Sequence, residues 1–215
     1  VFLGIVLVSS GIITANIWKT SASVGSAVTD AVFQVSSIIT TTGFSSVDFD
    51  LWPQLSKTVL FLLMFIGGLQ SLLAAAAITA GGLKVSRVII MFKSARRELR
   101  RILHPRSVSS LKFEGKTVDS EAEHGVLSYF SMYFIVFALL LFLLCLEPLD
   151  FETNVTAVAA CYNNIGPGFA GVGPMASFAG YSDFSKLVLS AAMLLGRLEL
   201  YPLLLTFAPS TWAKK

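Results

Sequence analysis

The chain has 215 residues, of which 54% are hydrophobic and 13% charged, with a mean hydropathy of +0.74 and a formal net charge of +3. This balance excludes an ordinary soluble domain and predicts an integral membrane protein. The two cysteines, Cys145 and Cys161, fit neither a disulfide framework nor a metal-binding spacing, so we expect buried thiols.

Four apolar runs are candidate membrane spans. The three uncharged runs cover residues 1–18, 59–83 and 127–146. Each has about the length needed to cross a ~30 Å hydrocarbon core. The fourth run, 187–208, is interrupted by Arg197 and Glu199. Because the chain opens inside an apolar run without methionine, we expect it to be cut from a longer protein rather than to begin with a signal peptide.

A loop, a short helix and a polar stretch lie between the first two spans. Residues 19–25, rich in Ser and Thr, are expected to form the loop that leaves the first span. Residues 30–39 predict a helix that is too short to cross a bilayer and too apolar for a surface loop, which indicates a re-entrant segment. After it come Thr40, Thr41, Thr42, Gly43 and Phe44. Unpaired backbone groups facing lipid cost several kcal/mol, so a polar stretch at membrane depth must line a wet cavity. There its carbonyl and hydroxyl oxygens can replace the water around a monovalent cation, and Gly43 permits positive φ.

An ordinary turn at a helix end is the usual explanation for a single stretch of this kind. The second half of the chain, however, contains a similar arrangement. After the span that ends near residue 146, Asp150 and Glu152 suit a helix amino terminus, and the helix is expected to run to about Tyr162. The stretch that follows is Asn163, Asn164, Ile165, Gly166, Pro167, Gly168 and Phe169. It is again polar, glycine-rich and uncharged.

The segment between the two halves is irregular and then basic. Residues 55–87 carry Gly67-Gly68 and Gly81-Gly82 around an Ala-rich middle, which predicts a broken helix rather than one straight span. The basic run comprises Lys84, Arg87, Lys93, Arg96, Arg97, Arg100, Arg101 and Arg106. The positive-inside rule places this loop, 84–124, and the carboxy terminus in the cytoplasm. Nucleic-acid binding is disfavoured, and His104 and His124 match no metal motif.

An internal repeat joins these features. Ser56-Lys57 recurs as Ser185-Lys186, and at the same offset Gly67 meets Gly196. The Gly-Phe pair of the first polar stretch recurs as Gly168-Phe169. We therefore predict an all-α integral membrane protein with two repeats of span, re-entrant pore helix, polar loop and span. The expected units are a pore repeat over 1–100, a cytoplasmic basic linker over 101–125 and a second pore repeat over 126–215.

At these residues the sequence resembles the Trk/Ktr/HKT superfamily of potassium transporters, and within it the Trk-type membrane subunit of bacteria. The resemblance rests on 41–44, 81–84, 163–168, 173–174 and 185–199. It implies four repeats around one potassium filter with one glycine from each, of which this chain holds the third and fourth. The implied filter residues are Thr40, Thr41, Thr42, Gly43, Phe44, Asn164, Ile165, Gly166, Pro167 and Gly168. Gly43 and Gly168 are the implied filter glycines, and potassium is the substrate, with no cofactor.

The resemblance also implies a gate below the filter, in the inner helix of the third repeat. In family members this helix is interrupted by a short Gly/Ser-rich loop, whereas the interval 68–80 here is rich in Leu and Ala and favours helix. Arg197 costs at least about 2.5–3.5 kcal/mol inside a membrane unless it faces a pore or a protein partner. Repeat symmetry aligns it with Gly68, so we expect a gate of Arg197, Gly67 and Gly68, in which unwound backbone near the glycines holds the guanidinium.

The expected partners are the missing amino-terminal repeats or a second chain, a cytoplasmic nucleotide-binding regulatory subunit, and membrane lipid, with the full-length protein forming a homodimer. The basic loop would face the regulatory subunit, although anionic lipid headgroups explain the same charges. The predicted function is potassium uptake at a bacterial inner membrane, including symport. The alternatives are a sodium-coupled or less selective cation transporter and a structural subunit that does not conduct. A membrane-embedded hydrolase is disfavoured, because neither histidine falls within a span.

Overall fold

The computed structural model describes residues 2–21, 23–76, 96, 97, 100, 112, 113, 116, 117 and 120–197. Its principal helices are α1 (Phe2–Ile17), α2 (Val24–Ile39), α3 (Gln54–Ala76), α5 (Ser120–Leu144), α6 (Phe151–Tyr162) and α7 (Asp183–Arg197). The loops contain the short 3-10 helices η1 (Phe49–Leu51), η2 (Ala170–Val172) and η3 (Phe178–Gly180). In the described part of the chain, the only strands are β1 (Lys112–Phe113) and β2 (Lys116–Thr117), which pair antiparallel. The predicted helical class is confirmed.

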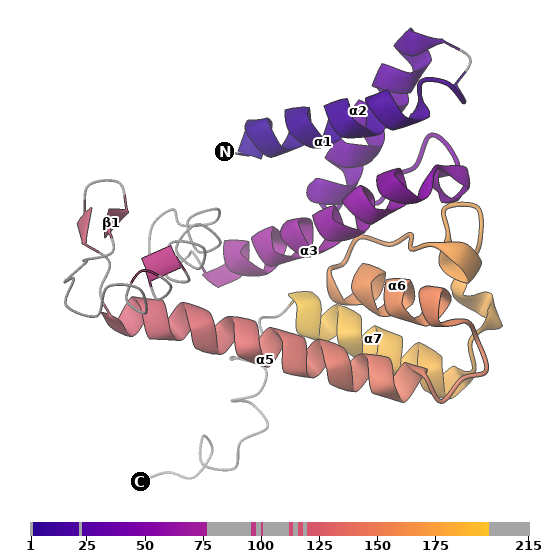
Figure 1. Ribbon diagram of the computed structural model, residues 1–215. Helices are drawn as coiled ribbons and strands as arrows, with labels where there is room; N and C mark the ends of the chain where they lie inside the picture. Colours follow the sequence, from indigo (N-terminus) through magenta and orange to yellow (C-terminus); the bar gives the residue numbers. More distant parts are fainter. Residues whose placement is uncertain are drawn as a thin grey trace, which may run out of the picture.

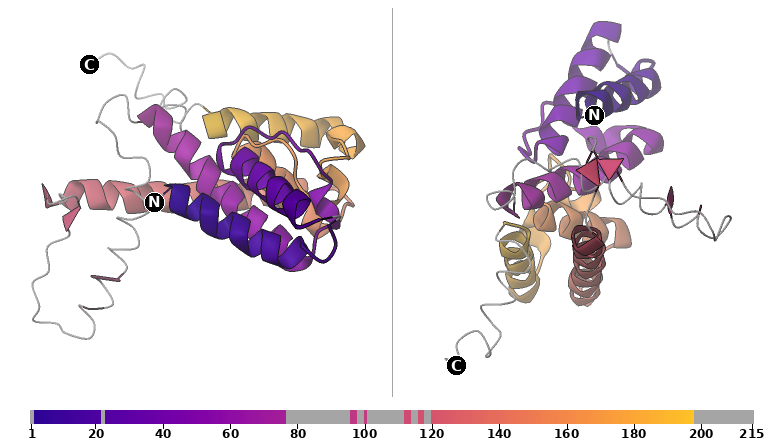
Figure 2. Two further views of the ribbon diagram at one scale, coloured as in Figure 1. Left: turned by 90° about the horizontal axis from the view of Figure 1, so that it is seen from above. Right: turned by 90° about the vertical axis from the view of Figure 1, so that its left-hand side faces the viewer.

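The helices form two sets, α1 to α3 and α5 to α7 (Figure 1). In the first set α2 packs against α1 and α3, and in the second α6 packs against α5 and α7. The two sets lie side by side, and α3 contacts both α6 and α7 (Figure 2). Phe65 of α3 meets Phe137 of α5 edge to face, with ring centroids 5.4 Å apart. The two sets therefore pack against each other through apolar side chains.

The two short helices end as expected, but α2 begins earlier than its sequence suggests. α6 ends at Tyr162, as predicted. We expected α2 to begin near residue 30, whereas it begins at Val24. Ser23 and Ser26 form a reciprocal capping box, in which each side chain accepts a hydrogen bond from the other residue's backbone N–H. This cap satisfies orphan donors and extends the helix into the serine-rich segment that the prediction assigned to a loop.

One expectation for α3 is wrong. The helix continues through Gly67 and Gly68 to Ala76, so the backbone at this glycine pair is not unwound. A Cβ on Gly67 would lie 2.8 Å from the Ile38 carbonyl oxygen and 2.9 Å from that of Ile39. Gly67 thus allows α3 to approach the end of α2 closely, which requires a missing side chain rather than a broken helix. Gly81 and Gly82 lie outside the described residues.

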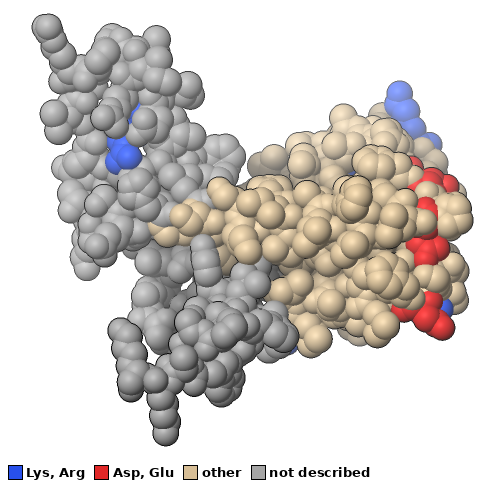
Figure 3. Space-filling model, turned by 90° about the horizontal axis from the view of Figure 1, so that it is seen from below, with Lys and Arg blue, Asp and Glu red and all other residues tan. Residues whose placement is uncertain are grey.

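Charge is distributed unevenly over the surface. Figure 3 shows Asp and Glu side chains gathered at one end of the molecule. The described acidic residues in or beside the turns between helices are Asp48, Asp50, Glu147, Asp150, Glu152 and Asp183. Across the residues that the structure describes, no helix combines the length and the apolarity of a membrane span.

Candidate functional site

The first polar loop begins with a Schellman motif at the end of α2. Thr40 is the cap, and Thr41 after it has a left-handed φ of 54°. The backbone N–H of Thr42 donates to the Ser37 carbonyl oxygen over 2.9 Å, which is the six-to-one bond of that motif. Gly43 then takes a φ of 78°, which confirms the positive φ expected for it.

The second polar loop repeats this geometry at the end of α6. Asn163 is the cap, and Asn164 has a φ of 55°. The backbone N–H of Ile165 donates to the Ala160 carbonyl oxygen over 2.9 Å. Gly166 then takes a φ of 112°. Two unlike sequences thus follow one backbone path.

The backbone therefore pairs Gly43 with Gly166. The sequence comparison paired it with Gly168, and for the geometry that pairing is wrong. Gly168 lies outside the left-handed region, and a Cβ on it would stand 2.8 Å from Val172 Cγ2 and 3.1 Å from the Thr156 carbonyl oxygen. Gly168 is needed for close packing under the second loop rather than for positive φ.

The two loops touch through their backbones. A Cβ added to Gly43 would overlap the carbonyl oxygen of Ile165 and would lie 3.4 Å from Pro167 Cδ. The structure thus brings residues of both predicted filter segments together. Thr40, Thr42, Phe44 and Gly166 are exposed, Thr41, Gly43, Asn164 and Pro167 are half-buried, and Ile165 and Gly168 are buried. The exposed members supply hydroxyl and carbonyl oxygens without charge, a set suited to a monovalent cation.

Buried side chains of α2, which sequence reasoning missed, brace the first loop. The Ser37 hydroxyl donates to the Phe44 carbonyl oxygen over 2.6 Å. Gln34, only 1% exposed, donates through Nε2 to the Ser45 hydroxyl over 2.8 Å. The Thr40 and Thr42 hydroxyl oxygens lie 2.7 Å apart. Polar residues on an otherwise apolar helix face were the available signal for these braces.

Side chains of α5 and α6 hold the second loop in place. The Tyr133 hydroxyl of α5 donates to Asn163 Oδ1 over 2.7 Å, in a buried position. The Tyr133 ring stacks on Tyr162, with centroids 4.8 Å apart. The Thr156 hydroxyl accepts from the Phe169 backbone N–H over 3.1 Å. These contacts fix the second loop to both α5 and α6.

One glycine of α3 and one of α7 each contact the end of the neighbouring helix. Gly67 of α3 abuts the end of α2, as described above, and a Cβ on Gly196 of α7 would overlap the Tyr162 carbonyl oxygen at the end of α6. The repeat match between Gly67 and Gly196 is thus a match in packing. Arg197 follows directly and is exposed, while Glu199 lies outside the described residues.

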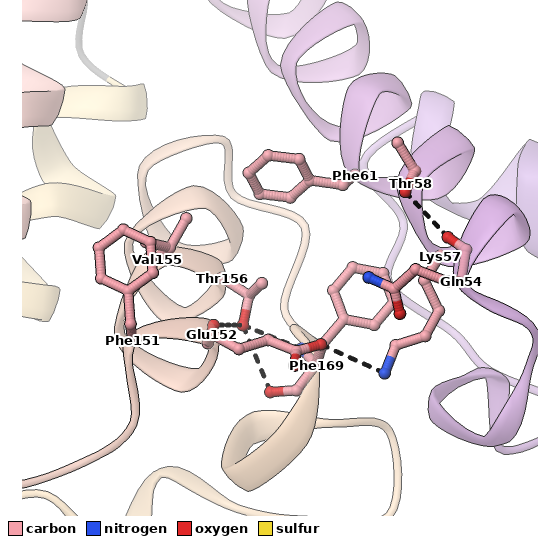
Figure 4. Close-up of a pocket in the computed structure, with 9 residues that line it drawn as sticks. All are labelled: Gln54, Lys57, Thr58, Phe61, Phe151, Glu152, Val155, Thr156 and Phe169. Atoms are coloured by element: carbon pink, nitrogen blue, oxygen red, sulfur yellow. Dashed lines mark hydrogen bonds and ion pairs between the residues drawn. The ribbon is translucent and has the colours of Figure 1, made fainter.

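An ion cluster joins the two helix sets beside a cavity of about 300 Å³ (Figure 4). Lys57 Nζ lies 2.8 Å from Asp50 Oδ1 and 3.2 Å from Glu152 Oε1. Burial alone would raise the pKa of Asp50, but the hydrogen bond and charge of Lys57, with the Ala170 backbone N–H, lower it. The described residues contain no group of His, Cys, Asp or Glu suited to a metal ion.

Glu147 ties the end of α5 to the start of α7, and this contact predicts a pH dependence. The hydroxyls of Ser182 and Ser185 both donate to Glu147 Oε1, the second over 2.8 Å. These bonds lower the pKa of Glu147 from its ordinary 4.5. A lowered pKa stabilises the fold above the unfolded value, and this stabilisation is lost as the pH falls through the folded value.

We expect the detergent-solubilised protein to lose thermal stability as the pH falls below about 4.5, with a smaller loss in Glu147→Gln. The substitution should also lower the unfolding temperature at pH 7, since the amide accepts both hydrogen bonds without charge. Asp183→Asn, at a fully exposed carboxylate, is the control. Identical pH profiles for the wild type and Glu147→Gln would contradict the assignment.

Comparison with known proteins decides the family. Residues 8–214 match the family described as TrkH, cation transport protein. The chain belongs to this family. It is 32% identical to the potassium transporter TrkH from Vibrio parahaemolyticus, whose crystal structure it matches with a TM-score of 0.82 over 99% of this chain and 44% of that one.

Curated relatives agree with this membership of the TrkH family. The chain is 34% identical to the Trk system potassium uptake protein TrkH of Salmonella typhimurium, over 98% of its own length and 42% of the relative's. It is 37% identical to the Trk system potassium uptake protein TrkG of Escherichia coli, over 84% of this chain and 36% of that protein. The chain thus spans about two fifths of the length of these relatives. Membership confirms the predicted resemblance to this family.

Proposed function

We propose that this chain forms two walls of a potassium uptake pathway in a bacterial inner membrane. The observation that carries the proposal is the pair of matching Schellman turns, which set two uncharged, oxygen-rich loops in backbone contact. Each loop follows the carboxyl end of a short helix, where the partial negative charge of the helix favours a cation. The proposed filter comprises the ten residues predicted from the sequence, with Gly166 rather than Gly168 as the counterpart of Gly43. Potassium is the transported substrate and not a cofactor.

An exposed apolar face of α2 indicates that further repeats complete the pathway. When α2 and α6 are aligned at their caps, Phe33 of α2 corresponds to Thr156 of α6. Thr156 lines the cavity between α6 and α3 and is 4% exposed, whereas Phe33 is 43% exposed. Val32 of the same face is 41% exposed and lines an open apolar groove between α1 and α2. We propose that an inner helix of an additional repeat, from a longer polypeptide or a second copy, covers this face.

Rubidium flux into liposomes tests the proposal. The chain is joined to the part of the Vibrio parahaemolyticus TrkH that it does not match, and this chimera is compared with the chain alone. We expect the chimera to carry rubidium, with potassium competing more strongly than sodium, and the monomeric chain to carry none. A folded chimera without flux would overturn the pathway. Equal competition by sodium would favour a less selective transporter. Flux through the monomeric chain alone would contradict the proposal that the chain supplies only two walls of the pathway.

Arg197 is proposed to act as a gate through its charge. It follows Gly196, which touches the end of α6, so its charge lies one residue from a contact under the second loop. The helical backbone at Gly67 and Gly68 leaves no unwound carbonyls there to hold the guanidinium. A positive charge near the pathway raises the barrier to cations.

Arg197→Ala should therefore raise resting flux through the chimera, by on the order of tenfold if the charge adds about 1.4 kcal/mol to the barrier. Arg197→Lys, which keeps the charge, is the control and should leave the resting flux low. If the flux of a folded Arg197→Ala protein were unchanged or lower, Arg197 would have a structural role and would not act as a gate.

The basic segment is proposed to contact a soluble nucleotide-binding regulatory subunit in the cytoplasm. Arg96 and Arg100 are exposed, in keeping with an accessible surface, while most of residues 84–124 lies outside the described residues. Anionic lipid would attract the same charges. A homodimer of the full-length protein and coupling to a second ion belong to the same proposal.

A further inference from the structure

Lys57 occupies the junction between the two repeats (Figure 4). It lies in the first turns of α3, and its side chain is only 15% exposed. Its ammonium contacts Asp50 of η1, in its own repeat, and Glu152 of α6, in the other. It also lies 5.5 Å from the centroid of the Phe169 ring, within the range of a cation–π interaction. One cation thus links a segment of its own repeat to two segments of the other repeat.

Two of these segments lead directly to the polar loops. Phe169 follows Gly168, and its backbone N–H is bonded to the Thr156 hydroxyl. Its ring also meets Phe49 edge to face, with centroids 5.4 Å apart. Phe49 and Asp50 belong to η1, which the chain reaches after leaving the first loop at Phe44. Lys57 is therefore placed to fix the outer end of the second loop relative to the segment that follows the first.

The matched lysine of the other repeat shows that this arrangement is specific to the junction. Lys186 occupies the same repeat position as Lys57, yet its ion pair with Asp183 is long, 3.9 Å, and both side chains are exposed. A surface pair of this kind contributes little. Lys57 and Asp50, with side chains 15% and 27% exposed, are better shielded from water and salt, while Glu152 is 49% exposed. The closer and partly buried cluster can therefore hold the loops more firmly than the pair at Lys186.

We infer that Lys57 is a positioning residue that holds the two polar loops in register from their outer ends and thereby tunes discrimination between cations. The part that concerns discrimination rests on the proposed function. The carbonyl oxygens of both loops must keep a fixed spacing to favour one ion size, and the contact between Gly43 and Ile165 places those loops against each other. A loose outer end would let that spacing vary.

The contacts are tested first, without reference to transport. Thermal unfolding of the purified chimera is measured for Lys57→Met, Glu152→Gln and the double variant, in low and high salt. We expect the effects of the two single substitutions not to add, because each removes the same ion pair. Lys19→Met, at an exposed lysine, is the charge-matched control and should show additivity with Glu152→Gln. Additive effects for Lys57 and Glu152 would overturn the link between repeats.

Discrimination between cations is tested in the rubidium flux assay. The concentration of potassium that halves the flux is compared with the concentration of sodium that halves it, and their ratio gives the preference. We expect Lys57→Met to reduce this preference at least threefold, Lys57→Arg to retain most of it, and Lys19→Met to retain all of it. If Lys57→Met folds poorly, Lys57→Met/Asp50→Asn, which removes the unpaired carboxylate, takes its place. Lower flux at an unchanged ratio would reduce Lys57 to a structural role and overturn the inference. Absence of flux in the unsubstituted chimera would instead overturn the proposed function, while the unfolding experiment would still decide the contacts.

Discussion

Replacing Gly43 by alanine is expected to abolish most of the preference for potassium over sodium while the protein still accumulates. An alanine at φ 78° is strained by roughly 1–3 kcal/mol. Its Cβ would in addition overlap the Ile165 carbonyl oxygen, which is backbone and cannot rotate away. One or both loops must therefore move, and at least a tenfold loss of preference in the rubidium competition assay should result.

Alanine substitutions at two other glycines distinguish the effect of backbone strain from that of steric overlap. Gly166→Ala meets an unfavourable φ of 112° but no atom within 4 Å, so it should have a smaller effect than Gly43→Ala. Gly4→Ala, at an exposed position of α1 with no atom within 4 Å, should leave the preference unchanged. A Gly43→Ala protein with the wild-type preference would show that the contact between the loops does not set selectivity.

Replacing Gly196 by alanine is expected to destabilise the protein strongly. The new Cβ would overlap the Tyr162 carbonyl oxygen and would lie 2.6 Å from Asn164 Nδ2. To avoid both atoms, α7 must withdraw from the end of α6, which breaks the 3.3 Å hydrogen bond from Asn164 to the Met193 carbonyl oxygen. Overpacking of this kind costs about 1–3 kcal/mol, and occasionally more.

Thermal unfolding in detergent measures this effect. Gly67→Ala is the matched variant in the first repeat, where the closest carbonyl oxygen is 2.8 Å from the added Cβ, and its unfolding temperature should fall less. Gly4→Ala, which adds a methyl group in open space, should not lower it. If Gly196→Ala unfolded at the wild-type temperature, α7 would have to be free to move away from α6.

The sequence was most informative where a signal is local. The end of α6 at Tyr162 follows from the change of an apolar helix into the polar Asn163-Asn164 pair, and α2 differs only because its Ser23 cap was assigned to a loop. The pairing of Gly43 with Gly168 failed because the two sequences were aligned on the phenylalanines Phe44 and Phe169. The turn geometry instead repeats at a fixed distance from the helix caps. Gly67 was predicted to break α3 because the sequence alone does not distinguish a glycine that bends a helix from one that lets a neighbouring helix approach closely.

Contacts between distant residues could not be anticipated in this way. Tyr133 meets Asn163, and Lys57 meets Glu152, across segments that are joined only by the fold. No periodic pattern marks either pair, since each residue is one polar position on an apolar helix or at its end. The resemblance to the family identified the loops but not what holds them.

The two turns also differ in how they are connected mechanically. Asn164 uses its amide to hold the Met193 carbonyl of α7, so a displacement of α7 pulls directly on the second loop. Thr41 occupies the same place in the first turn, where its shorter side chain carries no amide. A movement of α7 is therefore transmitted to the second loop through a side-chain hydrogen bond, and it reaches the first loop through the backbone contact between Gly43 and Ile165.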